Sequence, residues 1–355
     1  MKTGKPAGKV RLAIIGTGGM AHTHAKNFKS IPGCTIVAAA DIDRGRVEKF
    51  CAEFGIPQAY TDAGELLAHS GCNAVSIVAP DAMHAPLALQ CLKAGMHVLC
   101  EKPLALSHAL AARMVAAAKK SGRVNMVNFS YRNWPCLDAV AALVRSGAIG
   151  EVRHVEASYL QCWLSSKVWG DWHTSPGWLW RLSSRHGSRG TLGDIGVHIV
   201  DFASYPAGPI SSVYCKLKTF HKAPRDRVGP YVLDANDSVV FAVEFANGAV
   251  GSIQATRWSA GHPNRLFLKI SGTLGAVEID SDRTTDGYRV CSGPDLDRAK
   301  WRDKKVGPVP SIYARFISSI RTGRRQQPDF ARGAEVQKVL DAGFKSDALG
   351  RPVRV

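Results

Sequence analysis

One turn near the N-terminus restricts the fold of this chain more than any other feature. Residues 10–15 are apolar and predict a buried strand, and they run directly into the sequence GTGGMA at 16–21, which opens a helical pattern. In such a G-x-G-x-x-A turn, Gly16 permits the sharp bend, Gly18 lets a pyrophosphate approach the backbone, and Ala21 allows the helix to pack closely on the strand. Because the helix N-terminus also attracts the anion, the turn indicates dinucleotide binding.

A carboxylate after the second predicted strand supports this interpretation. Residues 35–40 are apolar, and Asp41 follows them, 20 residues after Ala21. In that position a carboxylate accepts hydrogen bonds from the ribose hydroxyls of adenosine and repels a 2′-phosphate. We therefore predict NAD as the cofactor, while the neighbouring Arg44 and Arg46 leave NADP as an alternative.

The domain organisation follows from a change of pattern along the chain. Apolar runs and helical patterns alternate through the first 125 residues, which is typical of strand–helix–strand units with a parallel sheet. From about residue 150, residues alternate in strand fashion between turn signals, which indicates an antiparallel or mixed sheet. We predict an α/β fold with three parts: a Rossmann NAD(P)-binding domain at 1–128, an α+β substrate-binding domain with a large open, mainly antiparallel sheet at 129–330, and a C-terminal helix and strand at 331–355 that pack back on the body.

Composition excludes several classes of protein. Hydrophobic residues make up 45% of the 355, which argues against wholesale disorder, and no uncharged apolar stretch reaches the roughly 18 residues that a membrane span needs. Residues 1–10 carry charge without an apolar segment behind them, so we expect a flexible tail in place of a signal peptide, and a cytoplasmic protein. The nine cysteines are scattered without a Cys-x-x-Cys pair, which predicts reduced thiols, no disulfide framework and no metal site.

The basic balance is concentrated in two segments. The formal net charge is +17, and residues 1–11 and 298–325 together account for 12 of these charges. A charge of this size suggests nucleic acid or acidic lipid as a partner. Neither a helix-turn-helix pattern nor an RNA motif with interleaved aromatic residues accompanies the segments, so we interpret them as solvated surface and predict no nucleic-acid or membrane partner.

A lysine follows a further predicted strand of the first domain. Residues 97–100 predict this strand, and Glu101-Lys102-Pro103 follows it directly. A cation at the carboxyl end of a parallel strand faces the crevice in which ligands of this architecture bind, and the proline stiffens the turn. Lys102 is therefore a candidate active-site group, and the alternative is an ordinary solvated lysine.

A carboxylate and an imidazole are grouped in the second domain. The sequence GTLGDIGVHIVD at 190–201 places Asp194 and His198 four residues apart, with Asp201 three residues further on, so a helix presents all three on one face. A carboxylate beside an imidazole fixes its tautomer and stabilises its protonated form, which suits general acid–base catalysis. The alternative is a helix-capping aspartate and a core histidine.

Together these motifs resemble the glucose–fructose oxidoreductase / inositol dehydrogenase / MocA (Gfo/Idh/MocA) family. The resemblance runs from about residue 10 to the C-terminus, and its most specific parts are Glu101-Lys102-Pro103 and the Asp194/His198 pair, with further support from residues 78–105, 131–132 and 147–152. It implies reversible hydride transfer from a secondary alcohol to nicotinamide. Lys102 would contact the reacting hydroxyl, and the Asp194/His198 pair would supply the base.

The resemblance also implies cofactor contacts and oligomers. His84 matches a recurrent family position near the cofactor, although we favour a structural role for it. The family forms oligomers, so we expect a homodimer or homotetramer through the open sheet of the C-terminal domain. The expected cofactor contacts are Gly16, Gly18, Gly19, Met20, Asp41, Pro80, His84, Glu101 and Lys102.

Tryptophans suggest the class of substrate. Five of the eight lie between 163 and 180, in Gly/Ser/Pro-containing sequence that predicts a loop. Indole faces stack on sugar rings, so we expect one or two of them to face a cyclic sugar, an anhydrosugar such as levoglucosan, or a cyclitol; the remainder would be packing anchors. The expected substrate contacts are Lys102, Arg132, Trp163, Trp172, Arg181, Asp194 and His198.

Other functions remain compatible with the same motifs. Some relatives use bound NAD to cleave glycosides by transient oxidation, and an NADP-linked sugar reductase would need the same groups. A non-catalytic dinucleotide-binding protein is a third alternative, against which the intact Lys102, Asp194 and His198 argue.

Overall fold

The computed structural model describes residues 8–355, which form two compact units. The first unit comprises the described chain up to Ser130 together with Pro310–Gln337, and the second comprises Tyr131–Val309 and Lys338–Val355. The expected N-terminal tail falls largely on residues 1–7, which lie outside the described residues. No helix within residues 8–355 is long and apolar enough to cross a membrane.

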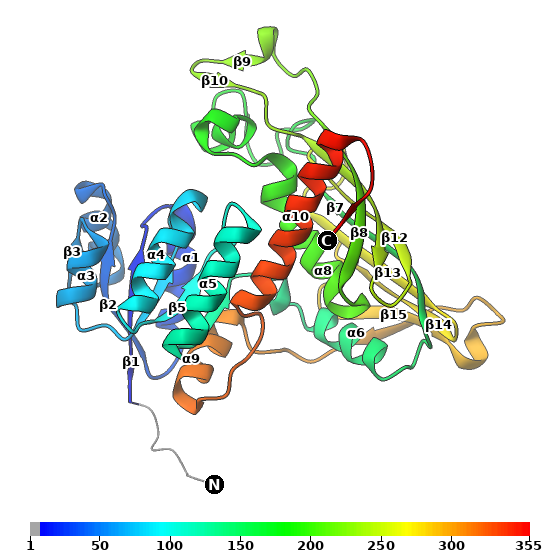
Figure 1. Cartoon of the computed structure of the whole chain (residues 1–355), viewed down its shortest axis with the longest axis horizontal. Coiled ribbons are helices and arrows are strands. Elements are labelled where there is room, and N and C mark those ends of the chain that lie inside the picture. The colour runs from blue at the N-terminus through cyan, green and yellow to red at the C-terminus, as the bar shows by residue number, and fades with distance from the viewer. Residues whose placement is uncertain (1–7) are drawn as a thin grey trace. The chain divides into compact units, whose positions relative to one another are not determined.

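The first unit is built on a six-stranded parallel sheet with the order β3-β2-β1-β4-β5-β6 (Figure 1). This is the Rossmann order, in which the chain reverses direction across the sheet between β1 and β4, and it confirms the predicted dinucleotide-binding fold. The innermost strand, β1, is apolar because it is covered on both faces. The strands are β1 (Val10–Ile15), β2 (Cys34–Ala40), β3 (Ala59–Tyr60), β4 (Ala74–Ile77), β5 (His97–Cys100) and β6 (Asn125–Val127).

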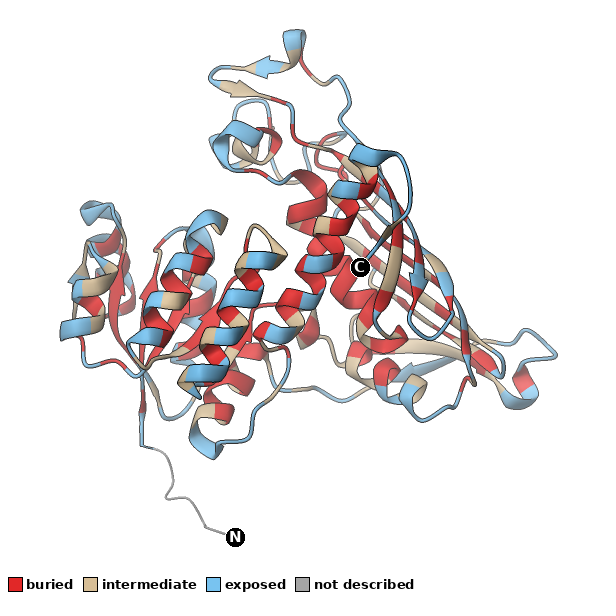
Figure 2. Cartoon of the chain, in the orientation of Figure 1, coloured by how far each residue is buried: buried red, intermediate tan, exposed pale blue. Residues whose placement is uncertain are grey.

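Helices connect these strands, and several begin and end at residues suited to the purpose. The Asp43 side chain caps α2 by accepting from the Arg46 N–H, and the Ser107 side chain caps α5 in the same way. Figure 2 shows the resulting pattern, with buried residues toward the sheet and exposed residues on the outer faces. The helices of this unit are α1 (Gly19–Lys29), α2 (Arg44–Phe54), α3 (Ala63–His69), α4 (Asp81–Lys93), α5 (His108–Ser121) and α9 (Ile312–Thr322).

Helix α9 belongs to the first unit although it follows the second in sequence. Its aromatic residues Tyr313 and Phe316 pack edge-on against Phe28 of α1, with ring centroids 5.1 and 6.4 Å away. The sequence division placed residues 310–330 in the second domain, because the chain gives no local signal that this helix returns to the first sheet. Helix α10 (Phe330–Leu349) then contributes residues to both units.

The second unit contains a nine-stranded sheet with the order β16-β15-β14-β13-β7-β12-β11-β8-β17. β7 and β12 pair in parallel and the remaining pairs of this sheet are antiparallel, so the predicted large, mainly antiparallel sheet is confirmed. The strands are β7 (Val152–Leu160), β8 (Ile210–Lys218), β11 (Ser238–Phe245), β12 (Val250–Thr256), β13 (Arg265–Gly272), β14 (Gly275–Asp280), β15 (Gly287–Ser292), β16 (Arg302–Lys305) and β17 (Val353–Arg354). A separate hairpin pairs β9 (Arg227–Val228) with β10 (Tyr231–Val232).

One face of this sheet is covered by helix α8 (Val197–Ala207), which contacts β7, β12 and β13 (Figure 1). Its sequence is apolar almost all round, as expected of a helix buried on every side. The strands alternate buried and exposed residues, so the face away from α8 carries the exposed set, as β11 shows. The unit also contains α6 (Pro135–Arg145), which packs on α8, and the short α7 (Pro176–Leu179).

Candidate functional site

The glycine turn between β1 and α1 has a backbone that requires glycine. Gly16 has φ +90°, and a Cβ on it would lie 2.5 Å from the carbonyl oxygen of Val78, so a side chain there is excluded on two grounds. Its N–H donates to the carbonyl of Ala40 at 2.8 Å. The turn is thereby fixed against the ends of β2 and β4, and Pro80, two residues beyond Val78, is the N-cap residue of α4.

The next residues leave open space in front of a helix N-terminus. A Cβ on Gly18 or Gly19 would meet nothing within 4 Å, and Gly18 caps α1 without a side-chain hydrogen bond. The first turn of α1 holds no acidic residue, and Met20 is half exposed. Unshielded N–H groups at a helix N-terminus, with room for a ligand against glycine backbone, fit a pyrophosphate.

Asp41 follows β2 and is held as a carboxylate. The backbone N–H and hydroxyl of Thr17 donate to its Oδ2 at 2.8 and 2.9 Å, and Arg46 donates to its Oδ1 at 3.2 Å. Burial raises the pKa of Asp41, but the hydrogen bonds from Thr17 and Asp43 and the charge of Arg46 outweigh it and lower the pKa. The Arg46 side chain is half exposed and can move away from Asp41, so the carboxylate can accept hydrogen bonds from ribose hydroxyls. These residues therefore fit NAD.

Glu101, directly after β5, is buried and satisfied by three donors. It accepts from His24 Nε2 at 2.8 Å, from Asn128 Nδ2 at 2.6 Å and from the backbone N–H of Lys102 at 3.1 Å. Because the carboxylate only accepts, His24 Nε2 carries a proton, and its Nδ1 lies 2.8 Å from the Ser76 hydroxyl. This buried network ties β4, β5, β6 and α1 to the turn that presents Lys102.

The environment of Glu101 keeps it ionised. Burial raises its pKa, but hydrogen bonds from His24 and Asn128 and the charges of His24 and Lys102 lower the pKa to about 2. Tyr313 of α9 closes the network, since its hydroxyl accepts from Asn128 at 3.1 Å and its ring lies edge-on to His24. The serine–histidine–glutamate order resembles a nucleophilic triad, but Ser76 is fully buried, so the arrangement is structural.

His84 supports the same turn from the other side. It is 1% exposed, and its ring nitrogens lie 2.7 Å from the carbonyl oxygen of Pro103 and 2.9 Å from that of Ala79. Both contacts join the Glu101-Lys102-Pro103 turn to the segment that precedes α4. These contacts favour the structural role over direct cofactor contact.

In the second unit, Asp194 lies in a π-helical turn, Leu192–Gly196, that leads into α8. Its Oδ2 accepts from the guanidinium of Arg257 at 2.9 Å and lies 3.7 Å from Nε of Arg181. A π-helical turn replaces the regular helix at Asp194, whereas His198 and Asp201 lie three residues apart in the regular helix α8. Asp201 pairs with Arg132 through two hydrogen bonds of 2.6 and 2.7 Å.

His198, in the first turn of α8, lies beside a closed ring of hydrogen bonds. The hydroxyls of Tyr131 and Tyr159 contact each other, Tyr159 donates to Oδ1 of Asn264 at 2.7 Å, and Asn264 Nδ2 donates back to Tyr131 at 3.2 Å. The His198 ring stands edge-on to Tyr131 at 4.9 Å. Burial, then the neighbouring Tyr131 and Asp194, raise the pKa of Tyr159 well above its ordinary value, so its hydroxyl stays protonated.

Three expected substrate contacts occupy structural positions. Arg132 is 1% exposed and is committed to Asp201, with its guanidinium over the Tyr205 ring. Trp163 and Trp172 are 2% and 3% exposed and belong to an apolar cluster with Leu179 and other residues of the loop. The Trp163 ring packs on Trp178 and the Trp172 ring stacks on His173, so the expectation that Trp163 and Trp172 face a sugar is revised: both are core residues here.

Arg181 keeps a place in the candidate site. Its guanidinium lies over the Trp180 and Trp178 rings, at 4.6 and 5.3 Å from their centroids, and stays partly exposed beside Asp194. The sequence reasoning missed Arg257, which donates to the same carboxylate. Alternation along β12 was the available signal, because it places Ile253, Ala255 and then Arg257 on the buried face, and a buried arginine requires a partner.

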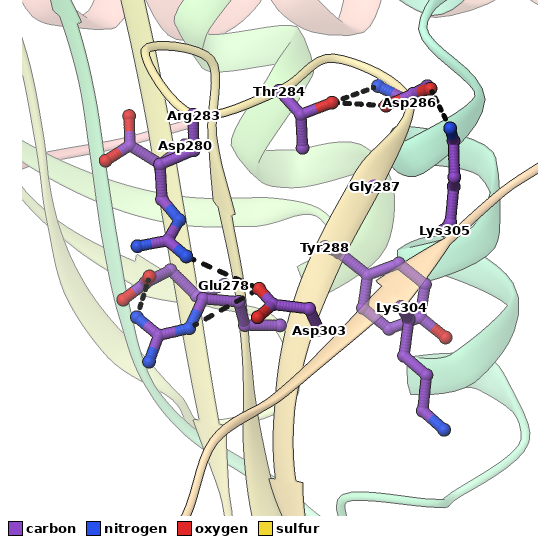
Figure 3. Close-up of a pocket in the computed structure, with 11 residues that line it drawn as sticks. Glu278, Asp280, Arg283, Thr284, Asp286, Gly287, Tyr288, Asp303, Lys304 and Lys305 are labelled. Atoms are coloured by element: carbon purple, nitrogen blue, oxygen red, sulfur yellow. Dashed lines mark hydrogen bonds and ion pairs between the residues drawn. The ribbon is translucent and has the colours of Figure 1, made fainter.

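A charged hollow of about 320 Å³ lies at one edge of the nine-stranded sheet (Figure 3). Its charges pair within the wall: Arg283 contacts Asp303 at 3.4 Å, and Lys305 contacts Asp286 at 3.8 Å. None of the expected site residues lines it. Part of the basic segment 298–325 is therefore balanced by acids of the same sheet edge; the charged lining residues are Glu278, Asp280, Asp286, Asp303, Arg283, Arg289, Lys304 and Lys305.

Two family models match the chain. Residues 10–129 match an oxidoreductase family with an NAD-binding Rossmann fold, and residues 137–278 match the GFO/IDH/MocA C-terminal domain. The two matched segments lie in the parts of the chain that carry the dinucleotide turn and the Asp194/His198 pair.

Relatives with sugar or cyclitol dehydrogenase names match most of the chain. Levoglucosan dehydrogenase of Pseudarthrobacter phenanthrenivorans is 27% identical over 96% of this chain and 96% of its own. Inositol 2-dehydrogenase of Rubrobacter xylanophilus is 30% identical over 76% of this chain and 71% of its own. A solved structure of levoglucosan dehydrogenase in complex with NADH and levoglucosan superposes with a TM-score of 0.87 at 27% identity and covers 98% of this chain and 99% of its own.

Proposed function

Since the chain belongs to the Gfo/Idh/MocA family of NAD-binding oxidoreductases, we propose that it is an NAD-dependent dehydrogenase that oxidises a secondary hydroxyl of a cyclic sugar, anhydrosugar or cyclitol. Lys102 of the first unit and Asp194 and His198 of the second are the proposed acid–base groups. Arg181 is a proposed substrate contact. The cofactor contacts proposed directly are Gly16, Gly18, Gly19, Met20, Asp41, Pro80 and Lys102, with Glu101 and His84 supporting the lysine turn.

One observation carries the proposal. Gly16, Asp41 and Lys102 follow β1, β2 and β5, three parallel strands of one sheet, so all three stand at its carboxyl edge. Ligands of open parallel sheets bind at that edge. A cation held there by a buried network is therefore on the same side of the sheet as the dinucleotide turn, where a group that contacts both nicotinamide and a reacting hydroxyl must lie.

The chemistry divides among a few side chains. Bound NAD supplies the acceptor for the hydride that leaves the alcohol carbon. His198 takes the hydroxyl proton as general base, and Lys102 donates a hydrogen bond to the oxygen as negative charge develops on it. Asp194, held by two arginines, presents a fixed carboxylate that orients the imidazole and the substrate. Positioned acid–base groups of this kind contribute roughly 10²–10⁴ in rate.

The substrate class is supported by the relatives and by their coverage. The levoglucosan dehydrogenase that matches 96% of this chain and the inositol 2-dehydrogenase that matches 76% act on rings with several secondary hydroxyls, to judge by the compounds in their names. The partly exposed Arg181, stacked on Trp180 and donating to the carbonyl of Gly177, supplies a rigid cationic donor for such hydroxyls.

A substrate panel tests the proposal. The purified protein is incubated with NAD or NADP and with hexoses, inositols and anhydrosugars, and NADH formation is followed by absorbance. We expect steady NADH release with at least one cyclic polyol and a preference for NAD. Glycoside cleavage without NADH would identify the hydrolase alternative, and activity confined to NADPH and a ketose would identify the reductase; either result contradicts the proposal.

Matched variants test the assigned residues. Lys102→Ala and His198→Ala should each lower kcat by roughly 10²-fold or more, whereas the exposed Lys120→Ala and His154→Ala should leave it unchanged. NADH binding, measured by fluorescence, should persist in His198→Ala. Full activity in both Lys102→Ala and His198→Ala would refute the site.

The open face of the nine-stranded sheet is the proposed interface of a homodimer or homotetramer. Tyr214, Val240 and Val250, on β8, β11 and β12, are each about half exposed, which is unusual for large apolar residues on neighbouring strands. Sedimentation at several protein concentrations measures the oligomeric state, and a monomer throughout would contradict this assignment.

A further inference from the structure

Arg257 is a fully buried cation that the proposed reaction does not use. It follows β12, and its exposed fraction is 0%, on the inward face of the strand after Ile253 and Ala255. Burial lowers the pKa of Arg257, and the charge of Asp194 opposes that effect. A guanidinium is buried at a high cost unless it is paired, so its position depends on Asp194.

The guanidinium joins three parts of the second unit. One terminal nitrogen donates to Oδ2 of Asp194 at 2.9 Å, and the other donates to the carbonyl of Arg181 at 3.0 Å. The guanidinium carbon lies 5.0 Å from the Trp163 ring centroid. Trp163 is itself fixed, because its Nε1 donates to Gln161 at 3.0 Å and its ring packs on Trp178. The tryptophan-rich loop, residues 163–180, therefore supports Arg257, and Arg257 supports the carboxylate of Asp194.

We propose that Arg257 is a positioning residue, which holds the carboxylate of Asp194 in one orientation and balances its charge, and that the tryptophan-rich loop is the support of this arrangement. The inference rests on the proposed function, because it assigns a partner to the proposed catalytic Asp194. It gives the loop a role in place of the expected sugar-stacking one. Arg257 acts through Asp194, since its side chain is sealed from solvent.

The ion pair between Arg132 and Asp201 of α8 differs from the pair between Arg257 and Asp194. Arg132 and Asp201 use both carboxylate oxygens, and their side chains are 1% and 3% exposed. At Asp194, both Arg257 and Arg181 approach the same oxygen, Oδ2, and a quarter of the side chain is exposed. The Asp201 carboxylate is thus sealed within its pair, whereas the Asp194 side chain stays 25% exposed beside its two arginines.

Two variants and a matched control test the proposal. Arg257→Lys keeps the charge but cannot make the forked contacts to Asp194 and Arg181, and Arg257→Met removes the charge at similar length. Arg289→Lys is the control: Arg289 also pairs with a carboxylate, that of Glu278 at 3.2 Å, and also lies over a tryptophan, Trp301 at 5.2 Å, but at the far edge of the sheet.

The kinetic readout separates positioning from folding. Arg257→Lys should lower kcat by roughly tenfold to a hundredfold, since displacing a catalytic group by about 1 Å can lower the rate by up to about 10²-fold. The KM for NAD and the affinity for NADH, measured by fluorescence titration, should change by less than about twofold, as should every parameter of Arg289→Lys. Tryptophan fluorescence and thermal unfolding establish that each variant is folded.

The pH profile of kcat/KM supplies a readout that lost stability cannot move. The charged and titratable groups around Asp194 are Arg181, Arg257, Tyr159 and His198. Removing one cation from this set raises the pKa of the base, so the acidic limb of Arg257→Met should move to higher pH by about half a unit. The limb of Arg257→Lys should stay in place because the charge is kept.

Each outcome decides the question. If the wild type oxidises a sugar but folded Arg257 variants keep its kcat and pH profile, the inference is wrong while the proposed function stands. If Arg257→Met does not fold, Arg257→Lys decides, and a kcat equal to that of Arg289→Lys overturns the inference. If the wild type oxidises no sugar, the proposed function fails first and the inference falls with it.

Discussion

The buried carboxylate of Glu101 allows a quantitative prediction about the turn that presents Lys102. In Glu101→Gln, an amide NH₂ replaces one carboxylate oxygen, so it must face either the donors His24 and Asn128 or the backbone N–H of Lys102. One donor then meets another in a buried site, which is unfavourable. The variant should therefore be less stable than the wild type at neutral pH, and the turn should be less well ordered.

The magnitude follows from the pKa of Glu101. The folded state lowers this pKa from an ordinary value of 4.5 to about 2, and at about 1.36 kcal/mol for each unit this is about 3 kcal/mol of stability at pH 7. A lowered folded-state pKa contributes stability that is complete above the unfolded value and is lost as pH falls through the folded value. The difference between wild type and variant should shrink below about pH 4.5, to about 1.5 kcal/mol at pH 3 and to about 0.4 kcal/mol at pH 2.

The assay must distinguish the two units. All eight tryptophans lie in the second unit. Their fluorescence therefore follows the unfolding of that unit, which does not contain Glu101, and serves as an internal control. Urea unfolding at pH 7 and pH 3 is followed by far-UV circular dichroism, and hydrogen exchange is measured for peptides that contain β5 and β6. Faster exchange in those peptides, without a change in the tryptophan transition, is the expected result.

A matched surface variant controls for the loss of charge. Glu48 pairs with Arg44 on the exposed side of α2, and Glu48→Gln should cost less than about 0.5 kcal/mol at either pH. Glu101→Gln with a stability within 0.5 kcal/mol of wild type at pH 7, or with a pH-independent deficit, would refute the assignment of Glu101 as an ionised anchor.

Two further predictions concern the cofactor turn. Asp41→Asn removes the charge that repels a 2′-phosphate and frees Arg46 to bind one, so the ratio of kcat/KM for NADP to that for NAD should rise roughly tenfold or more, and an unchanged ratio would contradict the role of Asp41. Gly16→Ala places a Cβ 2.5 Å from the Val78 carbonyl at φ +90°, so it should weaken NADH binding more than about tenfold and lower the melting temperature; wild-type affinity by fluorescence titration would show that the bend tolerates a side chain.

The first unit was largely predictable because its signals are local. The glycine turn, Asp41 and the strand–helix alternation lie close in sequence, and Val47, Phe50 and Phe54 at three- and four-residue spacing predict α2 with its observed bounds. Helix α3 was missed because it has seven residues and buries only Leu66, too few for a periodic pattern. Strand β16 was missed because all four of its residues are charged and exposed, as suits a protected sheet edge.

The part of the candidate site in the second unit was less predictable because its contacts join residues that are distant in sequence. Asp194 and His198 were identified from their spacing, but Arg257 comes 63 residues after Asp194 and no local pattern connects the two. Trp163, Trp169 and Trp172 lie in turns, as expected of a loop, whereas Trp178 lies in α7 and Trp180 in a 3₁₀ helix. Whether these side chains are buried depends on what the segment folds onto. Only the tertiary structure reveals that Trp163 packs inward beneath Arg257.

The late return of α9 to the first unit has a consequence for synthesis on the ribosome. The chain passes from one unit to the other after Ser130, Val309 and Gln337, so the first unit lacks its last helices until almost the whole chain has been made. Until Tyr313 and Phe316 emerge, Phe28 and His24 on α1 of the nascent first unit lack the aromatic rings that cover them. A chain stopped near residue 309 should therefore yield an incomplete first unit that binds chaperones.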